Sequence, residues 1–169
     1  MYITGRLAQV LRGMRSYKQQ ILGLSEMRWT ESGRMESEGA TILYSGEQLH
    51  ERGVGIILGK EAARTLLSWD SISDRIIMAR IETRFTKAII VQVYAPSNTA
   101  EDEEKEILYE QLHGVLDEIP DHDMKILMRT LMHRLVQTGL DGRRLWAEWR
   151  KEKDRIMVKG CWTYAAATG

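Results

Sequence analysis

The chain has 169 residues, a length that suits a single domain. Its 24 basic and 24 acidic side chains give a formal net charge of zero. This balance argues against a tight, sequence-independent binder of nucleic acid, because such proteins carry a basic excess or a basic stripe. The single cysteine, Cys161, excludes an internal disulfide and fits a reducing compartment. With no apolar run long enough for a membrane span and no signal-peptide segment, we expect a soluble, intracellular protein with no membrane contact.

The N-terminal part predicts a helix followed by a buried strand. Apolar residues recur at helical spacing through residues 5–17, with arginines elsewhere on the wheel. The apolar run at residues 21–24 then predicts a short strand that stops at Ser25 and Glu26. A carboxylate at the end of a core strand is well placed to meet a ligand. The simpler interpretation is that Glu26 is the first solvated residue after the strand.

The middle of the chain has the short, turn-separated strands of a sandwich rather than the alternation of strands and helices. Residues 31–39 are polar and glycine-rich, which predicts a loop, and residues 60–69 predict a short helix or an ordered connection. Pro96 interrupts the sheet, because proline lacks a backbone donor, and residues 100–119 predict an amphipathic helix that Pro120 ends. The predicted strands lie at residues 21–25, 40–44, 54–58, 75–81, 88–94 and 124–128, forming one sheet and part of a second.

Several long motifs occur in order along this part of the chain. They are ILGLSEMRW (residues 21–29), GATILYSG (39–46), GVGIILGKEA (53–62), TRFTKA (83–88) and VQVYAPSN (91–98). Together they resemble the endonuclease/exonuclease/phosphatase superfamily, whose fold is that of DNase I. More narrowly, they resemble the apurinic-type endonuclease domain of LINE retrotransposons, including the craniofacial development protein 2-like group. Collinear motifs of this length are far more specific than a lone catalytic tripeptide.

The resemblance implies an α+β fold, a partial four-layer α/β sandwich of the DNase I-like type. It also implies cleavage of DNA phosphodiesters with Mg²⁺, a hard ion that prefers oxygen ligands. Glu26 matches the family's metal-binding glutamate, and Tyr94 matches the tyrosine that approaches the scissile phosphate. Asn98 matches a weaker substrate-binding position. Without the resemblance, Tyr94 is an ordinary aromatic residue at a sheet end and Asn98 a helix cap.

Three elements of the family pattern are missing from this sequence. The strand that carries the metal-binding asparagine should precede Met1, and the late aspartate and the Ser-Asp-His motif should follow the last residue. A Gly-Asp-Phe-Asn motif should follow Met128, where the chain reads RTLMH instead. From Thr130 onward, codons can be chosen for this sequence such that a reading frame shifted by one base encodes Asp-Phe-Asn-Ala. The same shifted frame then encodes further residues that resemble the family sequence.

We therefore predict that residues 1–128 are a partial superfamily domain and that residues 129–169 are an out-of-frame tail, helical and then irregular. Potential ligands in the tail, such as His133 and Asp141, are then accidents of the reading frame. For function, the sequence predicts a degenerate and catalytically inactive fragment, with Glu26 and Tyr94 vestigial, Mg²⁺ not stably bound and DNA binding doubtful. Two alternatives remain open: an active Mg²⁺-dependent endonuclease, and a non-enzymatic interaction module derived from the relic.

Overall fold

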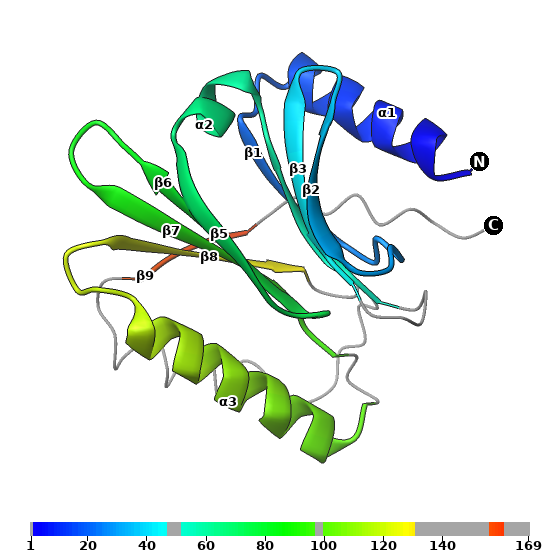
Figure 1. The fold of residues 1–169 in the computed structure, drawn as a ribbon. Helices are drawn as coiled ribbons and strands as arrows, with labels where there is room; N and C mark the ends of the chain where they lie inside the picture. Colours follow the sequence, from blue (N-terminus) through cyan, green and yellow to red (C-terminus); the bar gives the residue numbers. More distant parts are fainter. Residues whose placement is uncertain (1, 47–51, 97–99, 131–155, 161–169) are drawn as a thin grey trace.

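Two β-sheets form the centre of the molecule, as Figure 1 shows. The structure is a computed structural model and describes residues 2–46, 52–96, 100–130 and 156–160. The first sheet is antiparallel and has the order β1-β4-β3-β2. Its strands are β1 (Ile21–Ser25), β2 (Ser32–Ser37), β3 (Ala40–Ser45) and β4 (Val54–Leu58).

The second sheet has the order β5-β6-β7-β8-β9 and is mixed. Strands β5, β6 and β7 are antiparallel neighbours, whereas β8 runs parallel to β7 and β9 parallel to β8. Helix α3 (Asp102–Glu118) makes the crossover that a parallel β7–β8 pair requires. The strands are β5 (Leu66–Ser73), β6 (Ile76–Glu82), β7 (Lys87–Tyr94), β8 (Met124–Thr130) and β9 (Ile156–Gly160).

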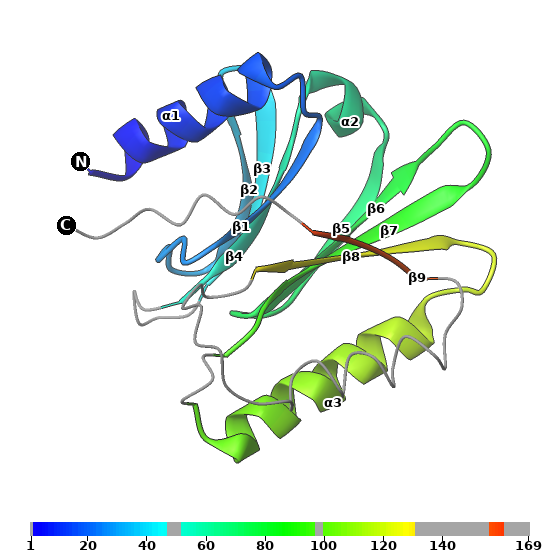
Figure 2. The ribbon, with the colours of Figure 1, turned by 180° about the vertical axis from the view of Figure 1, so that it is seen from behind.

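The molecule has four layers, with one helix outside each sheet (Figures 1 and 2). Helix α1 (Tyr2–Ser16) packs on the first sheet through Leu7, Leu11 and Met14. Helix α3 packs on the second sheet through four buried residues at helical spacing: Leu108, Leu112, Val115 and Leu116. Between the sheets lies a third cluster, built from β-branched and leucine side chains of both. These layers confirm the predicted α+β sandwich and the predicted outer helices.

The predicted strands are all present, within two residues at each end. Two segments differ from the prediction. The predicted loop at residues 31–39 contains β2, whose mostly exposed residues pair with the backbone of β3. The predicted helix or connection at residues 60–69 is helical only in α2 (Lys60–Arg64), and β5 begins at Leu66. Both missed strands are edge strands in which few side chains are buried, so no apolar alternation marks them.

Strands β8 and β9 contain residues that we assigned to the tail. Strand β8 continues two residues beyond Met128, and β9 pairs with its edge, Lys125 opposite Ile156. An irregular end was therefore the wrong prediction for residues 156–160. An apolar, β-prone run can satisfy its backbone against the open edge of β8 without a selected packing partner. The helix that we predict in the first part of the tail lies outside the described residues, which omit residues 131–155.

Within the described residues, no helix is long and apolar enough to cross a membrane.

Candidate active site

Glu26 leaves the end of β1 in an unusual backbone conformation. Its φ is +57°, and Arg28, two residues later, has a φ of +54°. Left-handed conformations are uncommon for residues other than glycine and persist only where the surroundings fix them. Here the surroundings are the chain before β4: Met27 N–H donates to the carbonyl of Gly53 at 3.2 Å, and Arg28 N–H donates to the carbonyl of Arg52 at 2.9 Å. The exposed Glu26 side chain is therefore held at a fixed place.

Tyr94 meets Glu26 from the other sheet. It is the last residue of β7, only 8% exposed, and its hydroxyl donates a hydrogen bond to Glu26 Oε1 at 3.2 Å. Burial raises the pKa of the Tyr94 hydroxyl, and the charge and the hydrogen bond of Glu26 raise it further. The charges of Arg75 and Arg52 act in the opposite direction. Tyr94 is thus held as a neutral hydrogen-bond donor. The structure brings together the two residues that the sequence pattern selected first.

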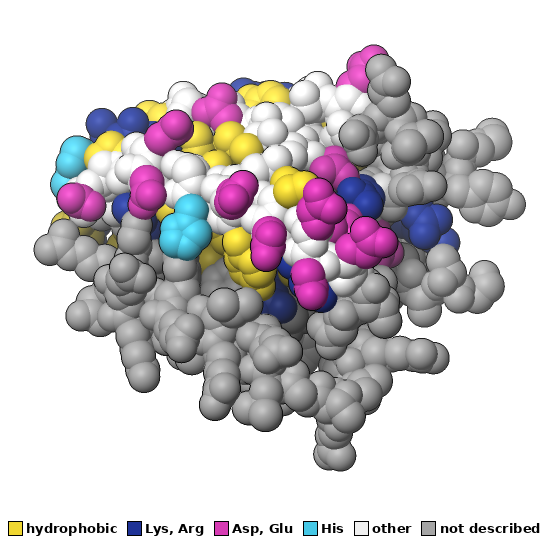
Figure 3. All heavy atoms as spheres, turned by 90° about the horizontal axis from the view of Figure 1, so that it is seen from below, with side chains coloured by type: hydrophobic (Ala, Val, Ile, Leu, Met, Phe, Trp, Pro, Cys, Tyr) yellow, Lys and Arg dark blue, Asp and Glu magenta, His cyan; other side chains and the backbone are white. Residues whose placement is uncertain are grey.

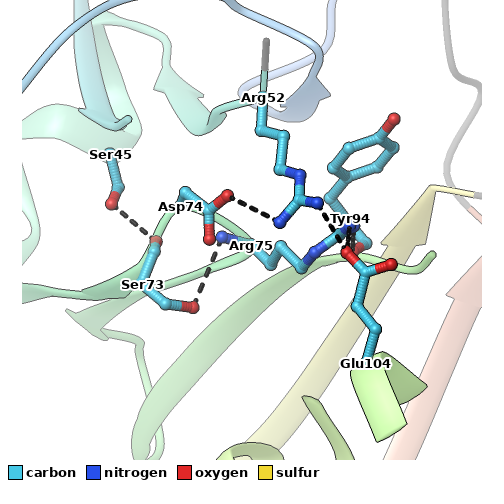
Figure 4. Close-up of polar contacts among 7 residues, drawn as sticks. All are labelled: Ser45, Arg52, Ser73, Asp74, Arg75, Tyr94 and Glu104. Carbon is cyan, nitrogen blue, oxygen red and sulfur yellow. Dashed lines mark hydrogen bonds and ion pairs between the residues drawn. The ribbon is translucent and has the colours of Figure 1, made fainter. Parts of the chain in front are cut away.

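Arg75 packs against the Tyr94 ring and is hydrogen-bonded to the Tyr94 backbone. Its guanidinium carbon lies 5.1 Å from the centre of the Tyr94 ring, a cation–π distance. The two residues also exchange bonds through their backbones: Arg75 Nη1 donates to the Tyr94 carbonyl at 3.2 Å, and Tyr94 N–H donates to the Arg75 carbonyl at 2.8 Å. Ser73 accepts a bond from Arg75 N–H at its Oγ, and its carbonyl accepts one from Ser45 (Figure 4). The bend before β6 is therefore tied to the first sheet.

Two acidic residues near this site are bound to arginines. Glu104, in the first turn of α3, lies with Oε1 2.5 Å from Arg75 Nη2 and 2.7 Å from Arg52 Nη2. Asp74 Oδ2 lies 3.7 Å from Arg52 Nη1. Figure 4 shows these side chains converging from the turn before β6, from α3 and from the segment before β4. The negative charges of both carboxylates are therefore compensated within the protein.

Mg²⁺ requires several oxygen ligands in near-octahedral geometry. Among the described residues, no group of three or more His, Cys, Asp or Glu side chains could hold a metal ion. Glu26 offers one carboxylate, and its Oε1 accepts the Tyr94 hydrogen bond. These residues do not fit a magnesium site. Asn98, the predicted substrate-binding residue, lies outside the described residues.

Sequence reasoning missed the arginine pair and the role of Glu104. Glu104 belongs to an acidic run at the start of α3, which the helix dipole alone explains, so the sequence gives no specific sign of its role. The adjacent charges of Asp74 and Arg75 just before a strong strand were an available signal that was not used. Gln92 was missed as well. It is fully buried within β7, and its Nε2 donates to Ser25 Oγ at 3.3 Å, linking the two sheets next to Glu26.

The outer face of α3 is acidic. Figure 3 shows magenta carboxylates spread over this face of the described part of the molecule. The helix sequence DEEKEILYEQLHGVLDE contains seven acidic residues and one lysine. A polyanion such as DNA is repelled by such a face.

Comparison with known proteins finds relatives over most of the chain. It is 32% identical over 125 residues to craniofacial development protein 2 of Bos taurus and 31% identical over 125 residues to that of Tragulus javanicus. Both matches cover 73% of this chain but only 21% and 22% of the relatives, so the chain spans about a fifth of their length. No protein-family model matches the chain.

Among solved structures, the chain is similar to the crystal structure of D. rerio TDP2 humanized by 14 mutations. The TM-score is 0.54 and the sequence identity 11%, and the match covers 74% of this chain and 54% of the other. At this identity the likeness concerns the fold alone. It confirms the DNase I-like sandwich that the sequence predicted.

Proposed function

We propose that this chain is a degenerate, catalytically inactive fragment of a retrotransposon-derived DNA endonuclease domain of the endonuclease/exonuclease/phosphatase superfamily. Its sequence is related to craniofacial development protein 2. In the ancestral domain, as the resemblance implies, a divalent metal stabilises charge on the scissile phosphate.

One observation carries this proposal. The pair Glu26–Tyr94 keeps its hydrogen bond and its constrained backbone, yet Glu104 is ion-paired to Arg75, the arginine that packs on Tyr94, and Asp74 to Arg52. Metal-assisted hydrolysis needs a metal held in an open position together with a positioned base. The described residues supply neither the ligand set nor a histidine–aspartate pair beside Tyr94. The scaffold of the site is present without the groups that carry the chemistry.

The same Glu26–Tyr94 geometry favours a second candidate, an active Mg²⁺-dependent endonuclease. Strained backbone conformations cluster at functional sites, and Glu26 has one at a strand end, where its carboxylate could bind a metal. In this candidate, the remaining ligands come from residues outside those described or from a partner chain. A co-opted interaction module is the third possibility, to which the acidic face of α3 lends support because it disfavours DNA.

A nicking assay separates these candidates. We expect the purified chain to leave supercoiled and abasic DNA intact with either Mg²⁺ or Mn²⁺, since losing the base and most ligands together removes several orders of magnitude in rate. The test compares the wild type with Glu26→Ala and with Glu82→Ala, an exposed acidic control on β6. Metal-dependent nicking that disappears in Glu26→Ala but persists in Glu82→Ala would establish the active enzyme instead.

The frame change after about Met128 is part of the proposal. It accounts for the absence of the Gly-Asp-Phe-Asn motif at the end of β8, where a metal-binding pair would otherwise emerge. The nucleotide sequence around codon 129 tests it directly. We expect the alternative frame to encode Asp-Phe-Asn-Ala followed by text similar to the family. A frame without that motif would refute this account while leaving the superfamily assignment intact.

A further inference from the structure

Two guanidinium groups converge on one oxygen atom beside Tyr94. Arg52 Nη2 lies 2.7 Å from Glu104 Oε1, and Arg75 Nη2 lies 2.5 Å from the same atom. The arginines come from different parts of the chain, and both side chains end at the Glu104 carboxylate (Figure 4). Guanidinium forks bind carboxylate and phosphate oxygens with the same planar geometry. The arrangement is therefore a site for an oxyanion, currently filled by a side chain.

The arginine nearer to Tyr94 has binding capacity left over. Arg75 is 9% exposed, and its fork uses Nη1 on the Tyr94 carbonyl and Nη2 on Glu104. Its Nε is buried and has no hydrogen-bond partner among the described residues. A buried donor without a partner costs free energy, and a ligand oxygen that reaches it recovers that cost. A ligand with several oxygens suits this site better than one carboxylate does.

The charges around the site show what Glu104 replaces. Arg52 and Arg75 provide two positive charges, and Asp74 and Glu104 provide two negative ones. Without Glu104 the cluster carries one positive charge, which equals in size the single negative charge of a phosphodiester. The side chain of Glu104 is 31% exposed, so it can turn outward into solvent. It also lies in the first turn of α3, where the helix dipole favours an anion.

We propose that Arg52 and Arg75 form a binding site for a phosphodiester oxyanion, and that Glu104 occupies this site as an internal competitor. The proposal deepens the proposed function, on which it rests, because the ancestral chemistry selects a phosphodiester among oxyanions. The site lies next to the Glu26–Tyr94 pair, with the Arg75 guanidinium 5.1 Å from the Tyr94 ring. Competition by Glu104 would keep the affinity of the unmodified chain for DNA low even though both arginines are present.

The test measures binding with and without the competitor. A short fluorescein-labelled oligodeoxythymidylate is titrated with the wild-type chain, with Glu104→Gln and with Glu103→Gln by fluorescence anisotropy at low salt. Glu103 is an exposed neighbour in the same helical turn, so its substitution makes the same change in net charge without releasing the arginines. We expect Glu104→Gln to bind about fivefold or more tightly than the wild type, and Glu103→Gln to differ from it by less than about twofold.

Two further measurements identify the residues and the ligand. Adding Arg52→Gln to Glu104→Gln should abolish the gain, and circular dichroism should show that the fold is kept; Arg52 is half-exposed, which makes it safer to replace than Arg75. Inorganic phosphate is titrated as a competitor. If phosphate displaces the oligonucleotide only at a concentration much higher than that of the oligonucleotide, the site is specific for a phosphodiester. If phosphate displaces it at a similar concentration, the site binds phosphate in general, and the phosphodiester assignment is overturned.

Equal gains in Glu104→Gln and Glu103→Gln, or a gain that survives Arg52→Gln, would overturn the proposal. These outcomes are independent of the nicking assay. Metal-dependent nicking would refute catalytic inactivity and leave the competitor mechanism standing. Absence of nicking together with no gain in binding would refute the competitor mechanism and leave the inactive fragment standing.

Discussion

The interior between the two sheets and the polar end beside Tyr94 are built by the same strands. They differ in how many residues each depends on. In the interior, Leu43, Ile56, Ile77 and Ile90 are fully buried, and each strand adds apolar contacts along its length. At the polar end, Glu26 and Tyr94 each contribute one group from one strand end. Packing is spread over many residues, whereas metal-assisted chemistry fails when a few ligands are missing. The fold can therefore outlast the activity.

The largest effect should come from the interior. Ile56 lies in β4, between β1 and β3, and is 0% exposed. We expect Ile56→Ala to lower the free energy of unfolding by about 2–5 kcal/mol, from lost burial and the cavity left behind. Glu26→Gln should lower it by less than about 1 kcal/mol, because the amide can still accept the Tyr94 hydrogen bond. Urea unfolding followed by circular dichroism measures both. Equal losses would contradict the contrast between interior and polar end.

Sequence reasoning was most successful where burial leaves a periodic pattern. The strands β4 and β7 and the helix α3 were predicted because nearly all of their core positions are apolar. The edge strands β2 and β5 were missed because backbone pairing with a neighbour, rather than side-chain burial, fixes them.

Some residues of the candidate site could be predicted from the sequence and others could not. Glu26 and Tyr94 were found because a long motif surrounds each of them, and the structure joins them by a hydrogen bond. The link between Arg75 and Glu104 spans 29 residues and connects the turn before β6 to a helix. Pairing of this kind depends on how the layers stack, and one sequence contains no local pattern that reports it.

A medium effect is expected where the two regions meet, at Gly23. An added Cβ there would collide with the side-chain amide of Gln92, which is fully buried and bonded to Ser25 and so has little room to move. We expect Gly23→Ala to lower the free energy of unfolding by about 1–3 kcal/mol. Gly114→Ala is the matched control, since nothing lies within 4 Å of a Cβ at this exposed helical position. It should raise stability by up to about 1 kcal/mol.

A double variant sharpens the test of this contact. If the collision with Gln92 causes the loss, Gly23→Ala should cost less in a Gln92→Ala background than in the wild type. Equal costs in both backgrounds would show that the backbone of β1 or another neighbour, such as Met128, is responsible.

The smallest effect concerns the proton of Tyr94. Burial, followed by the charge and hydrogen bond of Glu26, raises the pKa of the Tyr94 hydroxyl above its ordinary value of 10.0. The folded state therefore holds this proton more tightly than the unfolded state. The resulting stabilisation is fully present below the ordinary pKa and is lost as the pH rises through the raised pKa. Glu26→Gln removes the charge, so it should bring the pKa down, but only part of the way, because burial is the larger cause.

Absorbance titration of tyrosine ionisation measures this shift. The chain has six tyrosines, so the Tyr94 signal is obtained as the difference between each protein and its Tyr94→Phe counterpart. We expect the difference curve to move to lower pH in Glu26→Gln and to stay unchanged in Glu36→Gln, an exposed glutamate on β2. A curve that reaches the ordinary tyrosine value in Glu26→Gln would show that Glu26 alone sets the pKa. An unchanged curve would show that the two side chains do not interact in solution and would contradict the hydrogen bond between them.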